Sequence, residues 1–470
     1  MGRASAAARL FLLTALVAAA PAQDPAGGPV TWTTPDGARF VLVPDPRSPL
    51  VHWATASLVQ DPPRFAGLSL AAARAALAGT WSSGGRDGAR EAQVLDELDG
   101  VYRAWLGDRD AERTAEVARL TTLAQQLGDP AAHARVLATV PMHQPELLDR
   151  APVLVYVTTT VPSALPEVAA RMFDRREHSA LRTFHQTWFE TVVERATRLG
   201  GDADAALHAE VLALEMPDHP YLHELELPGQ DLPPRELALR TWQATQRPER
   251  TVHVLHGAFD TAATKALLDR TFAATTLPPA PPLPNVAARP IASQRRSVVP
   301  GARTPTIALA FVLPDGVDPD VLAVAARWLG DGADSHLGQE LPRQGRAGTT
   351  IACQAPWPPT IGGRSLLLLT ASDPDGTAGL LPLVRRTARE AVQTPPRPAA
   401  LDRAVAAAQR EWIATTDEPR RFAAAVAEAA LLWPDRPPRT TPVARVDGRA
   451  VQQLLARTLA TQPVIVEAQR

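Results

Sequence analysis

An internal duplication constrains the fold of this chain more than any other feature of its sequence. Three apolar segments of strand length recur in the same order in the two halves, and two of them are followed by a helical pattern. The segments are residues 49–58 with 68–80, 153–158 with 165–175 and 251–255 in the first half, and 306–313 with 321–330, 365–370 with 380–391 and 462–467 in the second. Strands separated by patterns of helical period indicate α/β or α+β layers. The sequence therefore predicts two domains of one architecture.

A proline-rich run separates the two copies. Residues 277–284 read LPPAPPLP, and a segment of this composition is extended and semi-rigid. Because the run falls between the copies, we expect a linker at 277–300. It would join an N-terminal domain at 23–276 to a C-terminal domain at 301–470.

One long stretch, from about residue 86 to residue 139, has no counterpart in the second half. Its pattern is helical and highly charged, and Gly107-Asp108 reads as a turn. The candidate apolar faces are Leu95, Leu98, Val101, Ala104 and Leu106 before the turn, and Ala115, Val117, Leu120, Leu123 and Leu127 after it. We expect an inserted helical hairpin within the N-terminal domain, which either covers core or offers a docking surface to a partner.

The first 22 residues have the features of an export signal. Arg3 and Arg9 lie in a positive segment, an apolar stretch runs from Leu10 to Ala20, and Ala20-Pro-Ala22 provides a small-residue cleavage site. The apolar stretch is too short to span a bilayer. We expect residues 1–22 to be a signal peptide and the mature chain to be exported, as a periplasmic or secreted protein without a membrane span.

Charge and cysteine usage narrow the class of protein. A net charge of −2 at pH 7 gives no electrostatic reason to expect a nucleic acid partner. Cys353 is the only cysteine of the 470 residues, so an exported form has no internal disulfide and depends on packed cores. The residues around Cys353 predict a strand with a buried structural thiol.

Five short landmarks occur in order along the chain. They are Pro35-Asp-Gly37 before an apolar strand, a helical pattern centred on residues 189–194, His219-Pro-Tyr221, a turn at 256–260, and the sequence LGDGADSHL at 329–337. Together they resemble the insulinase/pitrilysin family of zinc metallopeptidases, especially its short two-domain bacterial and mitochondrial-processing-type members. The resemblance covers nearly all of the mature chain. It implies an α+β fold with two homologous domains, each a mainly antiparallel sheet covered by helices, which face each other across a cavity.

The zinc helix of that family falls on residues 67–80, where its metal-binding residues are missing. In the family motif H-x-x-E-H, the first His falls on Leu70, the Glu base on Ala73 and the second His on Arg74. Leucine and alanine cannot bind zinc, and an arginine cation repels it. The third-ligand position falls on Glu194, which is retained, but one carboxylate alone makes a poor zinc site. Zinc is the cofactor of the family. Because these ligands are missing, we expect this chain to bind no zinc.

Other functional positions of the family are changed as well. The Arg and Tyr that the family presents to substrate from its second domain fall on Pro342 and Thr349, with Arg343 one residue out of frame. The strand edge that holds substrate in the family falls on residues 147–150. Pro152 follows closely, and a proline there weakens the addition of a further strand. The resemblance therefore implies lost catalysis, with no catalytic residue left to name.

The leftover carboxylate at position 194 can be satisfied in two ways. Because the family brings these positions onto one metal ion, we expect Arg74 to pair with Glu194 in place of the metal. The alternative is a rebuilt metal site, with His185 or His219 beside Glu194 as the candidate ligands. His219 is followed by a proline, which a helix accepts only in its first turn, so we favour the ion pair.

The predicted function follows from the resemblance and its losses. We expect a catalytically inactive insulinase-like subunit, exported, that partners an active zinc peptidase chain and forms half of a peptide chamber. One alternative is a stand-alone scaffold that binds a peptide or protein, as a monomer or homodimer. The other is an active metallopeptidase with the rebuilt metal site. A partner with an intact zinc motif favours the first, and chelator-sensitive cleavage favours the last.

Overall fold

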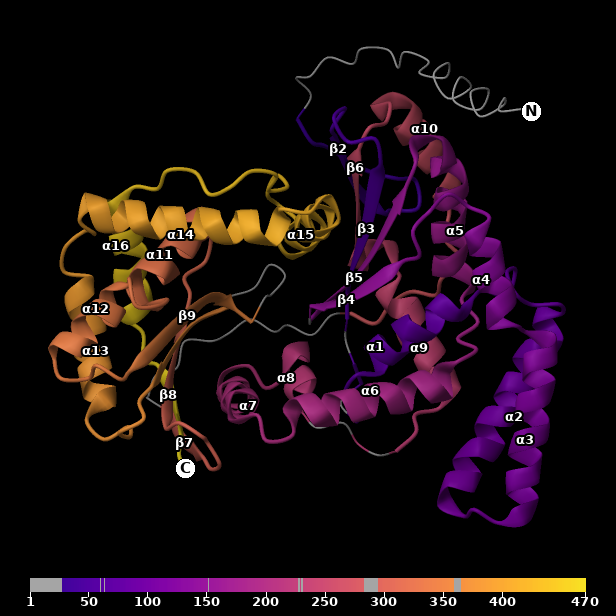
Figure 1. Cartoon of the computed structure of the whole chain (residues 1–470), viewed down its shortest axis with the longest axis horizontal. Helices are drawn as coiled ribbons and strands as arrows, with labels where there is room; N and C mark the ends of the chain where they lie inside the picture. Colours follow the sequence, from indigo (N-terminus) through magenta and orange to yellow (C-terminus); the bar gives the residue numbers. More distant parts are fainter. Residues whose placement is uncertain are drawn as a thin grey trace, which may run out of the picture.

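The chain folds into two α+β domains joined by one connection (Figure 1). The computed structural model describes residues 28–470, except residues 60, 63, 151, 227, 228, 230, 283–294 and 359–364. The expected signal peptide and the middle of the expected linker lie outside the described residues. Among the helices that are described, none is long and apolar enough to cross a membrane.

The first domain is built on a six-stranded sheet in the order β1-β2-β6-β3-β5-β4. Its strands are β1 Val30–Thr33, β2 Arg39–Pro44, β3 Val51–Leu58, β4 Glu146–Arg150, β5 Val153–Thr160 and β6 Thr251–Gly257. Only β2 and β6 pair in parallel; the other neighbours are antiparallel. Strand β3 is buried along its whole length, as expected of a central strand between two covering layers.

The second domain repeats this topology in five strands, in the order β7-β11-β8-β10-β9. Its strands are β7 Arg295–Val299, β8 Thr306–Val312, β9 Thr350–Trp357, β10 Leu366–Ser372 and β11 Val464–Ala468. Here too only the first pair, β7 with β11, is parallel. The second sheet therefore matches β2-β6-β3-β5-β4 strand for strand, which confirms the duplication and the predicted α+β fold with mainly antiparallel sheets.

Sixteen α-helices are described. In the first half they are α1 Leu68–Ala75, α2 Gly88–Gly107, α3 Ala111–Leu127, α4 Pro130–Ala138, α5 Leu165–His178, α6 Phe184–Leu199, α7 Ala203–Glu215, α8 Pro220–Leu225, α9 Arg235–Thr245 and α10 Thr261–Thr271. In the second half they are α11 Pro319–Gly330, α12 His336–Arg343, α13 Leu380–Ala391, α14 Pro398–Thr416, α15 Pro419–Leu432 and α16 Gly448–Leu459. An aspartate side chain accepts a backbone N–H at the start of α2, α3, α4, α7, α10, α11 and α16, a residue type that favours helix initiation.

The two domains exchange a helix. One face of each sheet is covered by helices of its own domain, and the other face is covered by a helix of the opposite domain (Figure 1). Helix α15 of the second domain packs Val426, Leu431 and a row of alanines on β3, β5 and β6 of the first sheet. Helix α7 of the first domain packs Leu207, Val211 and Leu212 on β8 and β11 of the second sheet. Both cores are therefore shared between the halves of the chain.

The inserted segment forms a hairpin of α2 and α3, which projects from the first domain, followed by a short third helix, α4 (Figure 1). The seam between α2 and α3 is narrow, so only some of the predicted apolar positions are buried. Ala104 and Ala115 are exposed, whereas Val94 and Ala124, which the sequence pattern did not single out, lie in the seam.

The connection between the domains is shorter than the predicted linker. The range 277–300 contains strand β7, which pairs with β11 in the second sheet. At its other end, Leu277 is buried and its carbonyl accepts a hydrogen bond from Arg247. The ends of the expected linker are thus parts of the two domains.

Candidate functional site

Helix α1 is buried. It carries the positions that match the zinc motif of the insulinase family, but none of its side chains at those positions can bind zinc. Leu70 is 4% exposed and Ala73 is 1% exposed. Gly67 is the N-cap residue of the helix, and its φ of 90° favours glycine. A Cβ at Gly67 would also lie 2.8 Å from the side chain of Arg195. The carboxylate of Asp61 accepts the backbone N–H groups of Gly67 and Ser69 at 2.5 and 2.6 Å, which satisfies the first turn.

Arg74 of α1 and Glu194 of α6 form the ion pair expected from the sequence. Arg74 Nη2 lies 2.6 Å from Glu194 Oε2, and Arg74 Nη1 donates to Thr191 Oγ1 at 3.2 Å. The two side chains are 28% and 57% exposed, whereas Thr191 is fully buried. The guanidinium therefore supplies the counter-charge of Glu194, as the resemblance led us to expect.

These residues do not fit a zinc ion. Of the four family positions, only Glu194 carries a group that binds zinc, and its carboxylate is engaged by the Arg74 cation. Within the described ranges, no three His, Cys, Asp or Glu side chains are grouped so that they could hold a metal ion. The described residues at these positions therefore do not form a zinc site.

The two histidines considered for a rebuilt metal site have other roles in the structure. His185 Nε2 lies 3.0 Å from Asp99 Oδ1 on α2, and its ring stacks on Tyr102 at 4.7 Å, so it fastens the inserted hairpin to α6. It is also nine residues from Glu194 along α6, about 13 Å at the rise of an α-helix. His219 is buried, and its Nδ1 accepts the backbone N–H of Tyr221 at 3.0 Å, capping α8. Burial lowers the pKa of His219 to about 4.

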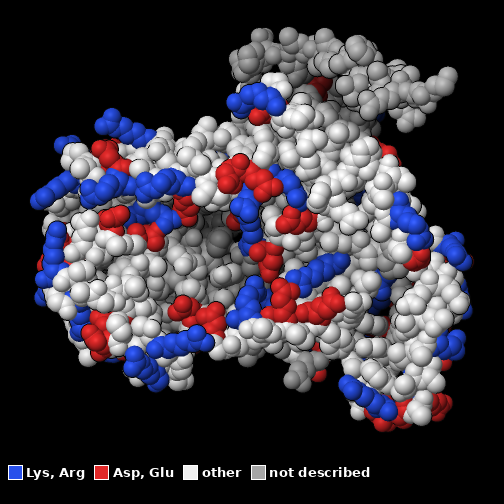
Figure 2. Space-filling view, viewed as in Figure 1, with Lys and Arg blue, Asp and Glu red and all other residues white. Residues whose placement is uncertain are grey.

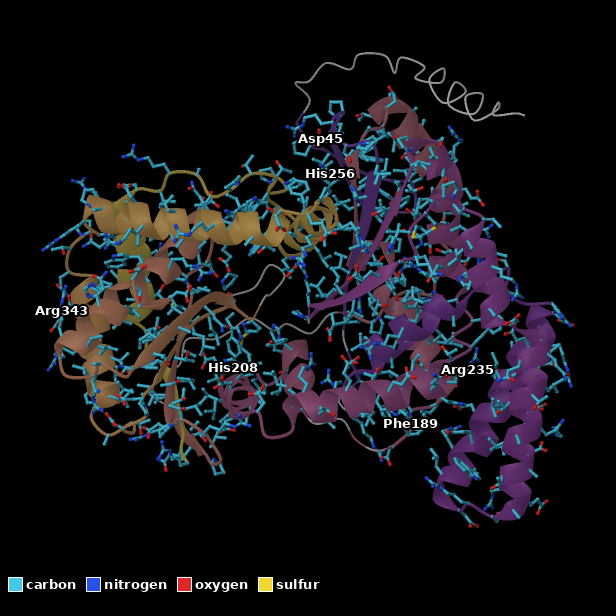
Figure 3. All side chains as sticks on the ribbon, in the orientation of Figure 1. Asp45, Phe189, His208, Arg235, His256 and Arg343 are labelled. Carbon is cyan, nitrogen blue, oxygen red and sulfur yellow. The ribbon has the colours of Figure 1, made fainter. Side chains whose placement is uncertain are left out.

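The second-domain positions of the family are not brought to α1. Pro342 lies inside α12, and Thr349 Oγ1 donates to Asp373 Oδ2 at 2.8 Å. Arg343 is 67% exposed and pairs with Glu340 of the same helix, on the outer side of the second domain (Figure 3). The helix buries Leu337 and Leu341, which turns its charged residues to solvent.

Strand β4, at the position of the family's substrate-binding strand, is the edge of the first sheet. Its side chains are ion-paired to helices of both domains: Arg150 with Glu428 at 3.0 Å and Glu146 with Arg420 at 2.5 Å on α15, and Asp149 with Arg198 at 3.6 Å on α6. Two of these pairs cross between the domains. These two pairs hold the edge strand β4 against α15, beside the space between the two domains.

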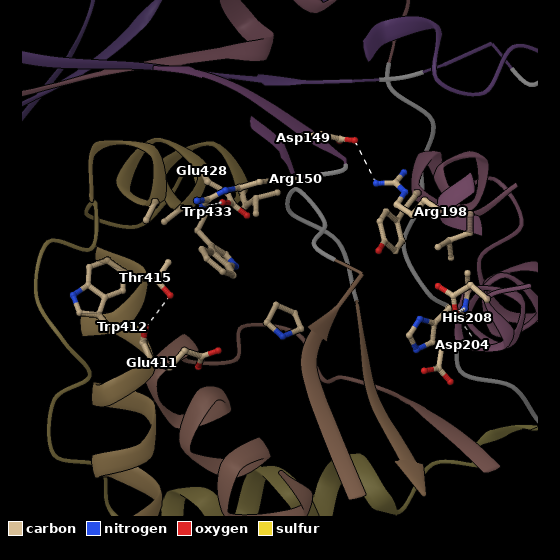
Figure 4. A pocket seen from close by; sticks show the side chains of 18 of the residues that line it. Asp149, Arg150, Arg198, Asp204, His208, Glu411, Trp412, Thr415, Glu428 and Trp433 are labelled. Atoms are coloured by element: carbon tan, nitrogen blue, oxygen red, sulfur yellow. Dashed lines mark hydrogen bonds and ion pairs between the residues drawn. The ribbon is translucent and has the colours of Figure 1, made fainter. Parts of the chain in front are cut away.

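That space is an interdomain cavity of about 840 Å³. The space-filling view shows a hollow between the halves, with charges of both signs around it (Figure 2). Its lining combines acidic Asp149, Asp202, Asp204, Glu411 and Glu428, basic Arg150, Arg198 and Arg439, and aromatic Tyr221, Trp412 and Trp433, together with His208. In the close view, Trp433 at the end of α15 reaches into the space, and Asp204 and His208 of α7 lie on the opposite side (Figure 4).

Sequence patterns did not reveal this lining, because it is assembled from α7, α14 and α15 of different domains and from strand β4. Burial lowers the pKa of His208, which keeps its ring neutral. Cys353 is buried in β9, and burial raises the pKa of its thiol to about 12, so it is an unreactive structural residue. The lining thus combines charged groups of both signs with aromatic rings, and no residue of α1 is among the described residues that form it.

Comparisons with known proteins agree with this geometry. Residues 238–408 match a family model described as the peptidase M16 inactive domain. No curated protein sequence matches with significance. The fold is similar to that of a peptidase M16 inactive domain from Pseudomonas fluorescens, with 13% identity, 94% of this chain and 98% of that chain covered, and a TM-score of 0.65.

Two further solved structures share the fold. A protease from Helicobacter pylori has 12% identity over 94% of this chain and 99% of its own, with a TM-score of 0.59. An M16-like peptidase from Alicyclobacillus acidocaldarius has 12% identity over 95% and 99%, with a TM-score of 0.56. The match over residues 238–408 and the fold shared over 94% of the chain make this protein similar to M16 peptidases, and in particular to proteins described as an inactive domain of that family.

Proposed function

We propose that this inactive peptidase homologue is an exported subunit that partners an active zinc peptidase chain and contributes half of a peptide chamber. The observation that carries the proposal is the contrast between α1 and the cavity. On α1, Leu70, Ala73 and Arg74 stand where the resemblance expects the two His ligands and the Glu base, and Arg74 pairs with Glu194. The two-domain frame and a cavity of about 840 Å³ are nevertheless present.

The cavity has the size and chemistry of a peptide site. Ligand pockets of proteins fall at about 300–1,000 Å³, and this one offers ionic groups of both signs for a peptide backbone and its side chains. The Trp433 ring adds an apolar surface. The Arg74–Glu194 pair gives the leftover carboxylate a counter-charge that is not a metal ion, which supports a non-catalytic role.

The experiment is isolation of the tagged mature chain from its native envelope, followed by mass spectrometry. We expect a co-purifying insulinase-like chain with an intact H-x-x-E-H motif in stoichiometric amount, and a mature N-terminus near Gln23. The reconstituted pair should cleave peptides in a chelator-sensitive reaction, whereas this chain alone should not. If the chain isolates alone, as a monomer or homodimer, the partner is disproved; a retained N-terminal segment disproves export by this signal.

One observation favours the stand-alone scaffold as the second candidate. The cavity is formed by residues from both halves of one chain, which supports a peptide site within this chain. Calorimetric titration of the isolated chain with a mixed peptide library separates the two functions. Binding without any co-purifying peptidase supports the scaffold.

A further inference from the structure

Arg175 on α5 is a buried cation without a carboxylate partner among the described residues. Its side chain is 8% exposed, and its guanidinium carbon lies 4.1 Å from the centre of the Tyr156 ring. Nη2 donates only to the sulfur of Met172, at 3.3 Å, and Nη1 has no hydrogen-bond partner. The face of the Tyr156 ring offsets part of the positive charge of Arg175. It does not accept a hydrogen bond from the N–H groups of the guanidinium.

The next residue on the same helix shows what a buried arginine normally requires. Arg176 is 2% exposed, and its Nη2 lies 2.6 Å from Asp36 Oδ2 and 2.8 Å from Glu177 Oε1. A buried charge is strongly disfavoured unless it is paired. Helix α5 therefore presents two buried cations to the interior. Within the described part of the chain, Arg176 has two counter-charges and Arg175 has none.

A row of side chains on the first sheet lies under α5. Strand register places Tyr156 on β5, Thr55 on β3, His253 on β6 and Phe40 on β2 side by side, so all four project from one face of the sheet. Neighbouring strands are about 4.8 Å apart, which puts His253 about 10 Å from Tyr156 across the row. Thr55, a small residue, lies between the two larger rings.

His253 carries a second buried donor without an acceptor. Trp53 Nε1–H donates to His253 Nδ1 at 3.4 Å, and the Thr55 hydroxyl lies 3.0 Å from the same nitrogen. Because an indole can only donate, Nδ1 is the acceptor and Nε2 carries the hydrogen. Nε2 is buried and has no hydrogen-bond partner among the residues that the structure describes. Burial, and then the charges of Arg176 and Arg175, lower the pKa of His253 far below its usual value, so the ring is a neutral donor.

We propose that a small monovalent anion of chloride size binds between α5 and the first sheet, accepting hydrogen bonds from Arg175 Nη1 and His253 Nε2. Such an ion supplies the acceptor that both groups lack and the counter-charge that Arg175 lacks. An ordered water satisfies the hydrogen bonds, but it leaves the charge of Arg175 uncompensated. The site is separate from the interdomain cavity and from the Arg74–Glu194 pair.

The test is thermal unfolding of the full mature chain in sodium chloride and in sodium gluconate at equal ionic strength. A ligand of the folded state alone raises the unfolding midpoint as its concentration rises, so we expect a higher midpoint in chloride that increases with its concentration. Arg175→Met should abolish the difference between the salts. Arg171→Met, a matched change at a residue 31% exposed on the same helix, should keep it. Equal midpoints in both salts, or a difference that survives Arg175→Met, would overturn the proposal.

Crystals of the unaltered chain grown in bromide give an answer that does not depend on how a variant folds. We expect an anomalous scattering peak within hydrogen-bond distance of both Arg175 and His253. A water there without anomalous signal, or bromide bound only on the surface, would contradict the anion site.

Discussion

The ion pair between Arg74 and Glu194 leads to a quantitative prediction about the former metal position. The variants are Arg74→Met, which keeps the aliphatic stem, Glu194→Gln, which keeps the shape of the side chain, and the double variant. Together they form a double-mutant cycle, which isolates the interaction energy of the pair from the other effects of each change.

The expected coupling is small, because the pair is partly solvated. Two charges about 4 Å apart interact by about 1 kcal/mol in water and about 4 kcal/mol at an effective dielectric of about 20. Side-chain exposures of 28% and 57% place this pair near the solvated limit, where measured couplings are about 0.2–1 kcal/mol. Arg74→Met also removes the hydrogen bond to the buried Thr191, which adds about 0.5–1.5 kcal/mol. We expect Arg74→Met to cost about 1–2 kcal/mol and Glu194→Gln less than about 1 kcal/mol.

Urea unfolding of the four proteins measures these differences in the free energy of unfolding. A coupling above about 2 kcal/mol would refute the solvated pair and indicate a desolvated one. A cost of Glu194→Gln greater than that of Arg74→Met would show that the carboxylate, rather than the arginine, holds this position together. No coupling at all would mean that the arginine does not replace the metal energetically.

Three further predictions concern the core, the motif and pH. Leu431→Ala, in the exchanged helix, should cost about 2–5 kcal/mol and shift one shared unfolding transition, detected by calorimetry; two separate transitions would contradict the shared cores. The triple variant Leu70→His, Ala73→Glu and Arg74→His, with Glu194 retained, should bind one equivalent of zinc, measured by elemental analysis. The quadruple variant that also carries Glu194→Gln should bind zinc more weakly. Burial, followed by the charges of His256 and Arg420, lowers the pKa of His52 from 6.5 to about 4. The unfolded chain thus takes up the proton more readily, so the free energy of unfolding should fall as pH drops from 6.5 to 4, and His52→Gln should reduce that slope.

The recurring segments of the sequence predicted the topology well, because strand and helix periods are local properties. The paired segments became β3 and β8, β5 and β10, and β6 and β11, in corresponding places of the two sheets. Motif spacing predicted the Arg74–Glu194 contact for a similar reason, since two helices of a known arrangement fix which positions meet. Strands β1 and β7 were missed, because they are short, lie at sheet edges and contain exposed residues.

The exchange of α7 and α15 could not be read from the sequence. The apolar face of α15, with Val426 and Leu431, shows that the helix is buried, but nothing in that pattern says which sheet it covers. The cavity was missed for the same reason, because His208 and Trp433 come from different domains and line one cavity only through that exchange. The burial of Arg175 was not predicted either, because an arginine near the end of an amphipathic helix normally keeps its charged group in water.

The helix exchange also means that half of this chain is not a complete folding unit. A fragment that ended in the connection would expose the apolar face of the first sheet that α15 covers, and the remaining fragment would expose the face that α7 covers. Two identical half-chains could cover each other by the same exchange with twofold symmetry, as in a domain-swapped dimer. Joining such halves end to end replaces a concentration-dependent encounter with an intramolecular one, at an effective concentration in the millimolar range. The present chain is, in that sense, a swapped dimer made permanent by one peptide connection, and dilution cannot separate its two halves.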